Sequence, residues 1–163
     1  MRNLGSLNQF LGIQASTTAS GILLHQQTYA RSILERARMS QSKPISTPVA
    51  YKTTMTATSH EPFSNPQLYR HPIGSLQYLT LTRPDIQFVV HQLCQHMQRP
   101  LNHHYDALKR LIRYINGTTH IGIQLQPQNL TLRGYVDADW ASNNLDRKSI
   151  SSHYNFLGNS LIS

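Results

Sequence analysis

The spacing of apolar residues changes at Gly117 in this chain of 163 residues. Before Gly117, apolar residues recur every three or four positions in several segments, which is typical of amphipathic helices. After Gly117 they alternate with polar residues or run in short stretches, which is typical of strands. The change predicts an α+β fold in which a group of helices is followed by the strands of a sheet.

Residues 1–49 are predicted to form a β-hairpin and a helix. The hairpin is indicated by apolar runs at residues 10–13 and 22–24, separated by a connection rich in Ser and Thr. The helix is indicated by apolar residues at helical spacing within residues 26–39. Residues 50–64 are again rich in Thr and Ser, without an apolar period, and we expect them to form a linker.

Residues 65–118 are predicted to form helices that pack as a small bundle, and residues 119–163 the first strands of a sheet. Pro66 is a favourable first residue for a helix, but Pro72 interrupts the same apolar stripe. Because an interior proline costs about 3 kcal/mol, the ordered helix is expected to begin either at Pro66 or only at Pro72. Asn102 is the expected cap of the last helix in this region.

The chain is strongly basic, with 15 Lys and Arg against 7 Asp and Glu, a formal charge of +8 and a pI near 10.0. Charge of this sign favours an anionic partner such as a nucleic acid. The candidate contact residues lie on or near the last predicted helix, on the side away from its apolar stripe: Arg99, Lys109, Arg110 and Arg113. Basic residues on one helix face can contact phosphates without reading sequence, and the alternative is a solvated helix face.

Cys94 is the only cysteine in the sequence, so neither an internal disulfide nor a paired-cysteine zinc site can form. No apolar stretch has the form of a secretory signal or the length of a membrane span. We therefore expect a soluble intracellular protein without a membrane partner.

Histidines gather at two places in the helical region. His91 and His96 flank Cys94 within one predicted helix, and a zinc site there would need further ligands. Cys94 also fits the apolar stripe of that helix, so we interpret it as a core residue. His103 and His104 open the next helix and are interpreted as exposed first-turn residues.

An ordered set of motifs runs through the whole chain. The set consists of LGSLNQFLGI at 4–13, Tyr69-Arg70 with GSLQYL at 74–79, TRPDI at 82–86, His104 with Ala107, KRL at 109–111, Arg113-Tyr114, Gly117-Thr118 and YVDADWA at 135–141. In this order the motifs resemble the Pol polyprotein of copia-type retrotransposons. The matching part runs from the reverse transcriptase segment just after the polymerase palm into the start of the RNase H domain.

The resemblance implies a primer-grip hairpin, thumb-like helices and the first strands of an incomplete RNase H-like sheet. It also implies an ancestral role in RNA-directed DNA synthesis coupled to RNase H activity, with Mg²⁺ as the cofactor of the intact family. The family's palm aspartates form an adjacent pair upstream of this region, and no adjacent Asp pair occurs in the sequence. Polymerase activity is therefore not expected of this chain. The compartment stays open among the nucleus, the cytoplasm and a plant organelle.

Asp137 matches the position of the family's first catalytic RNase H aspartate. Asp139 lies two residues on and shares the same face of the predicted strand. Two-metal hydrolysis needs several converging carboxylates, and the family's catalytic glutamate and later aspartate are expected beyond Ser163. Asp137 and Asp139 are therefore candidate metal ligands of an incomplete site.

These observations predict a non-catalytic fragment of a copia-type reverse transcriptase and RNase H polyprotein, with no cofactor and no small-molecule substrate. Two alternatives remain open. One is a nucleic-acid-binding module that holds RNA–DNA or DNA duplexes non-specifically through the four basic residues. The other is a residual nuclease that binds Mg²⁺ through Asp137 and Asp139.

Overall fold

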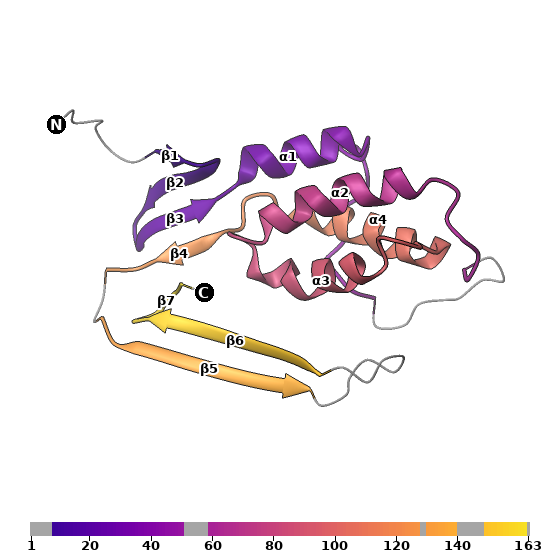
Figure 1. The fold of residues 1–163 in the computed structure, drawn as a ribbon. Helices are drawn as coiled ribbons and strands as arrows, with labels where there is room; N and C mark the ends of the chain where they lie inside the picture. Colours follow the sequence, from indigo (N-terminus) through magenta and orange to yellow (C-terminus); the bar gives the residue numbers. More distant parts are fainter. Residues whose placement is uncertain (1–7, 51–58, 128–129, 140–148, 163) are drawn as a thin grey trace. The chain divides into compact units, whose positions relative to one another are not determined.

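The computed structural model describes residues 8–50, 59–127, 130–139 and 149–162, and its fold belongs to the predicted α+β class. The helices and strands drawn in Figure 1 are, in chain order, β1 (Gln9–Phe10), β2 (Ile13–Thr18), β3 (Gly21–His25), α1 (Gln27–Arg36), α2 (Pro66–Leu79), the 3₁₀ helix η1 (Pro84–Ile86), α3 (Gln87–Gln95), α4 (Asn102–Gly117), β4 (Ile123–Leu125), β5 (Leu132–Asp139), β6 (Ile150–Leu157) and β7 (Ser160–Leu161). Two compact units divide the chain: Met1–Gln14 with His25–Gly122, and Ala15–Leu24 with Ile123–Ser163.

The core of the first unit lies among the four α-helices. Each helix buries one apolar stripe, and the stripes meet because α2 contacts α1, α3 and α4. The buried side chains are Ala30, Ile33 and Leu34 of α1, Tyr69, Ile73, Leu76 and Leu79 of α2, Ile86 of η1, Val89, Val90 and Leu93 of α3, and Leu108, Leu111, Ile112 and Ile115 of α4. A bilayer crossing needs a longer and more apolar helix than any in the described part of the chain.

α2 runs without a break through Pro72. It begins at Pro66, where the side chain of Asn65 caps it by accepting a hydrogen bond from the backbone N–H of Leu68 at 3.1 Å. The expected alternative start at Pro72 is therefore wrong. Tyr69 on one side of the proline and Ile73 on the other are fully buried. Burying each such side chain contributes about 1.5–3 kcal/mol, so burial along the whole stripe outweighs the cost of one interior proline.

The N-terminal hairpin is confirmed, but the Ser- and Thr-rich stretch expected to be its connection forms most of strand β2. Threonine suits a strand because its branched side chain fits a pleated surface. The turn from β1 to β2 uses Leu11 and Gly12, which both adopt left-handed backbone angles. The hydroxyl of Tyr78 donates a hydrogen bond to the Leu11 carbonyl, so α2 holds this turn in place.

The described strands of the second unit belong to two antiparallel sheets. β4 pairs with β3, with Ile22 opposite Leu125, although the sequence pattern grouped Leu125 with the later strands and Ile22 with the N-terminal hairpin. A Cβ on Gly21 would collide with the backbone oxygen of Leu125, so the close approach requires glycine. β5, β6 and β7 form a separate three-stranded antiparallel sheet in that order, and β1 to β4 follow one another in a four-stranded sheet.

Candidate nucleic-acid interface

Lys109, Arg110 and Arg113 lie on the side of α4 away from its buried stripe, as the sequence predicts. All three are half-buried. The helix presents them together because residues three and four apart lie on one face. The structure therefore brings three of the four predicted contact residues into one surface.

Residues 40–49, here called the anchored loop, cover part of this surface. The guanidinium of Arg110 donates a hydrogen bond to Thr47 Oγ1 at 2.7 Å, and Nε of Arg113 donates to the Lys43 carbonyl at 2.8 Å. Asn116, one turn further, donates to the Ser42 carbonyl at 2.8 Å. Arg110 and Arg113 therefore hold a loop in addition to carrying positive charge.

Lys109 and Arg99 are placed differently. The Lys109 ammonium lies 2.7 Å from the Asp106 carboxylate and 5.1 Å from the centre of the Tyr105 ring. Arg99 is exposed in the connection between α3 and α4. In that connection Arg70 of α2 donates to the carbonyls of Met97 and Gln98, at 2.7 and 3.1 Å.

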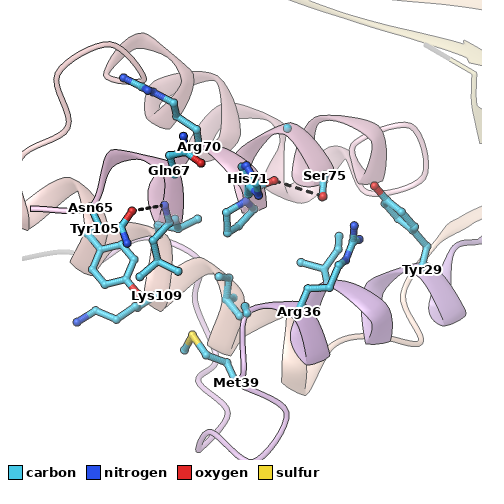
Figure 2. A pocket seen from close by; sticks show the side chains of 17 residues that line it. Tyr29, Arg36, Met39, Asn65, Gln67, Arg70, His71, Ser75, Tyr105 and Lys109 are labelled. Carbon is cyan, nitrogen blue, oxygen red and sulfur yellow. Dashed lines mark hydrogen bonds between the residues drawn. The ribbon is translucent and has the colours of Figure 1, made fainter. Parts of the chain in front are cut away.

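Two cavities have Lys109 in their walls. The first has a volume of about 790 Å³ and lies among α1, α2 and α4. Figure 2 shows Tyr29 and Arg36 on its α1 side and Arg70 and His71 on its α2 side. None of the described residues that line it is acidic. Sequence reasoning did not single out Arg36 and Arg70, because they lie on different helices and only the fold places both in the wall of one cavity.

The second cavity, of about 600 Å³, lies between α3, α4 and the anchored loop. Arg110 and Arg113 line it together with Lys109 and Asp106, so three cations and one carboxylate face the same hollow. A hollow with this excess of positive charge can attract a phosphate backbone.

Asp137 and Asp139 lie in β5, within the second unit. Asp137 is exposed, stands opposite Ser152 of β6, and accepts a hydrogen bond from the backbone N–H of Ala138 at 3.0 Å. Among the residues that the structure describes, no group of three or more His, Cys, Asp or Glu side chains could hold a metal ion.

The interpretation of His103 and His104 as exposed first-turn residues is wrong. Both are half-buried, and the His104 ring stacks on the ring of His96 with centroids 3.7 Å apart. α4 is capped by Leu101 in place of the expected Asn102, and the N–H of Leu101 donates to Nδ1 of His104 at 3.1 Å. Burial, and then the neighbouring His96 and His103, lower the pKa of His104 to about 4.

Cys94 packs against the core, in agreement with its interpretation from the sequence. Burial raises the pKa of its thiol, which disfavours the thiolate that metal binding and nucleophilic chemistry require.

Arg83 and Asp85 form an anchor that sequence reasoning did not assign, in which Arg83 is buried and the Asp85 side chain is 32% exposed. Arg83 is 1% exposed, and Nε and Nη2 donate to the two oxygens of Asp85 at 2.8 and 2.7 Å. Nη1 donates to the Thr118 carbonyl at 2.7 Å, and the Tyr114 hydroxyl donates to Asp85 at 2.9 Å. The TRPDI motif contains both residues, but from the sequence alone it served only as part of the family resemblance.

Burial raises the pKa of the Asp85 carboxyl, but hydrogen bonding and charge from Arg83 outweigh it and leave that pKa below its ordinary value. The anchor therefore holds the η1 turn against the end of α4 through an ionised pair. The anchor makes no described contact with the basic residues. It acts on their surface indirectly, by holding the end of α4 in place through Thr118.

Comparison with known proteins decides the family. The chain is 40% identical over its whole length to the uncharacterized mitochondrial protein AtMg00810 of Arabidopsis thaliana, of which it covers 68%. It is 41% identical, over 96% of its length, to the retrovirus-related Pol polyprotein from transposon RE2 of Arabidopsis thaliana, of which it covers 11%. The corresponding polyprotein from transposon TNT 1-94 of Nicotiana tabacum is 33% identical over 99% of the chain, which covers 13% of it. This chain belongs to the copia-type retrotransposon Pol family.

Membership in the copia-type Pol family rests on these sequence relatives. No protein-family model matches the chain, and no solved structure matches it. The chain corresponds to a small part of each Pol polyprotein, so the activities of those polyproteins are not thereby its own.

Proposed function

We propose that this chain is a non-catalytic fragment of the reverse transcriptase and RNase H region of a copia-type Pol polyprotein. The surroundings of Asp137 carry the proposal. RNase H chemistry needs several carboxylates that converge on two Mg²⁺ ions. Asp137 faces Ser152 across the ladder and uses one oxygen to accept from its own strand, with Asp139 as the neighbouring acid. The described residues do not fit a two-metal centre, and no hydrolytic step follows from them.

Incubation with an end-labelled RNA–DNA hybrid, in Mg²⁺ and separately in Mn²⁺, tests this proposal. Wild type and Asp137→Asn should both release no more product than a protein-free sample. An active RNase H added to the same mixture is the control that the substrate stays cleavable in the presence of the chain. Cleavage by wild type that disappears in Asp137→Asn would establish the residual nuclease instead.

The α4 surface favours a second candidate function, the non-specific binding of a nucleic-acid duplex. Lys109, Arg110 and Arg113 line one cavity on this surface together with a single acid, Asp106. The hydrogen bonds from Arg110 and Arg113 to the anchored loop limit the rotation of both side chains. Less side-chain entropy is then lost when these guanidinium groups meet a phosphate.

Fluorescence anisotropy of labelled RNA–DNA and DNA duplexes over a range of salt concentrations tests the second function. The variant Arg110→Ala/Arg113→Ala should bind more weakly, and the slope of log K against log salt should fall in magnitude by about 2. The control Arg31→Ala/Arg38→Ala removes the same charge from exposed residues of α1 and its end. It should keep the wild-type slope.

Because Arg110 and Arg113 also anchor a loop, a charge-retaining variant separates charge from folding. Arg110→Lys/Arg113→Lys should retain binding within about threefold, since Lys serves as a phosphate contact. Binding that is absent in wild type at low salt, or that falls equally in both alanine pairs, rules out the α4 surface as the interface.

A further inference from the structure

Strand β5 has one side without a partner strand in the described sheet. It pairs with β6 through eight consecutive residue pairs without a bulge, and the strand order β5-β6-β7 leaves its other side at the edge. The side chains of residues 132–138 are exposed, with Leu132 at 69% and Val136 at 81%. Prolines and bulges, which often protect an edge strand, are absent from β5, and its charged residues are Arg133, Asp137 and Asp139.

Backbone geometry restricts how two copies of β5 could pair. In a strand, every second residue directs its N–H and C=O towards the free edge. Two facing residues of an antiparallel pair must be of the same kind, so that either both direct these groups towards each other or both direct them away. Two identical strands related by a two-fold axis can therefore pair only in registers centred on a residue, never between two residues.

Among these registers, the one centred on Tyr135 matches the charges of β5. Arg133 then stands opposite Asp137 of the second copy, and Asp137 opposite its Arg133, so the symmetry creates two opposite-charge pairs on one face. On the other face, Val136 stands over Gly134 and Leu132 over Ala138. We propose that β5 of two copies of this chain pair antiparallel about Tyr135, and that the two Arg133–Asp137 contacts set the register.

Neighbouring registers fit less well. A register centred on Gly134 puts Arg133 opposite Tyr135 and leaves it without a carboxylate, and one centred on Asp137 puts two carboxylates face to face. A register centred on Val136 puts Arg133 opposite Asp139 but leaves both Asp137 residues opposite Tyr135. In that last register Asp137 has no cationic partner.

Arg133 changes partner when the dimer forms. In the single chain its guanidinium donates to the Gly158 carbonyl and to Asn159 Oδ1, at 2.5 and 3.2 Å. Asp137 offers an ionised acceptor in place of a neutral one, and hydrogen bonds between charged groups are the stronger kind. Asp137 has one oxygen engaged, with the N–H of Ala138, and the second can accept from Arg133 of the partner copy.

Charge exchange between two variants tests this register directly, with sedimentation equilibrium of the 163-residue chain and native mass spectrometry as readouts. Wild type should sediment as a concentration-dependent dimer. Arg133→Glu puts acid against acid, and Asp137→Arg puts base against base, so each variant alone should self-associate at least about tenfold more weakly. An equal mixture of the two should form a heterodimer, because both cross-strand pairs are then of opposite charge.

The mixture also controls for folding, since a variant that had lost its structure could not regain a partner. The double variant Arg133→Glu/Asp137→Arg in one chain should dimerise like wild type, whereas in a register centred on Val136 the introduced glutamate would face Asp139. Wild type that stays monomeric at its highest soluble concentration overturns the proposal. Single variants that dimerise as wild type does, or a folded mixture that stays monomeric, overturn it as well. None of these three results bears on duplex binding by α4, because the experiment measures self-association alone.

Discussion

Arg83 and Asp85 are joined by two parallel hydrogen bonds, at 2.8 and 2.7 Å, while Arg83 is 1% exposed. The same guanidinium reaches the end of α4 through Thr118. This arrangement ties the η1 turn to the helix that carries the candidate interface. The pair therefore stabilises the bundle, and it makes measurable predictions.

Arg83→Ala should lower the free energy of unfolding by about 1–2 kcal/mol, because it removes the buried donor of the Thr118 carbonyl and of the partly exposed Asp85 carboxylate. Arg83→Lys keeps the charge but cannot make the two-point contact, and should cost less than the alanine variant. Urea titration at unchanged m-value measures both. If Arg83→Ala lowers the free energy of unfolding by less than about 0.5 kcal/mol, as is usual for a surface residue, the anchor contributes little to stability.

Acid should weaken the Arg83–Asp85 anchor in a defined direction. The pKa of Asp85 is lower in the folded chain than its ordinary value, so the unfolded chain binds the proton more readily. The stabilisation is thus fully present above the ordinary carboxyl pKa of about 4 and is lost as the pH falls through the lower folded value. In Asp85→Asn the free energy of unfolding should be lower at neutral pH, and its difference from wild type should shrink on acidification. Urea midpoints taken over a pH series check this.

The stacked histidines should add a second acid sensitivity at higher pH. The pKa of His104 falls from 6.5 to about 4 on folding. Between these two pH values His104 is therefore protonated in the unfolded chain and neutral in the folded chain. The contribution of neutral His104 to the free energy of unfolding is therefore fully present above pH 6.5 and declines as the pH falls towards 4. His104→Gln should flatten the decline between pH 6.5 and about 5, a window above most carboxyl titration. His91→Gln, on the exposed side of α3, is the matched control and should leave the wild-type slope.

Pro72→Ala should stabilise the chain. Alanine restores a donor to the interior of α2, although some packing of the half-buried proline ring is lost. We expect a net gain of about 1–2 kcal/mol in the free energy of unfolding. Pro66→Ala is the matched control, because the N–H at the first helical position has no partner within the helix and its absence from proline costs nothing. This substitution should change the free energy of unfolding by less than about 0.5 kcal/mol. Equal effects of both substitutions would show that Pro72 carries no helical cost.

Apolar spacing was enough to find the helices, because burial of one stripe acts on each helix separately. Ile73 and Leu76 of α2, or Leu111 and Ile112 of α4, could be placed in the core from periodicity alone. Contacts between distant segments could not be found this way. The pairing of Ile22 with Leu125 and the bond from Arg113 to Lys43 join residues far apart in the chain, and neither leaves a local pattern.

By itself, the sequence determined the α+β class, the apolar stripes, the excess of positive charge and the copia-type family. Each of these depends on residue types and their order along the chain, and none requires knowing which distant segments are in contact. Only the tertiary structure decided that Pro72 stays inside a helix and that Arg83 is a buried anchor. It also decided that the basic face of α4 is shared with a loop. These outcomes depend on which remote groups supply burial and hydrogen-bond partners, and a backbone or charged group is stable in the interior only when such partners are present.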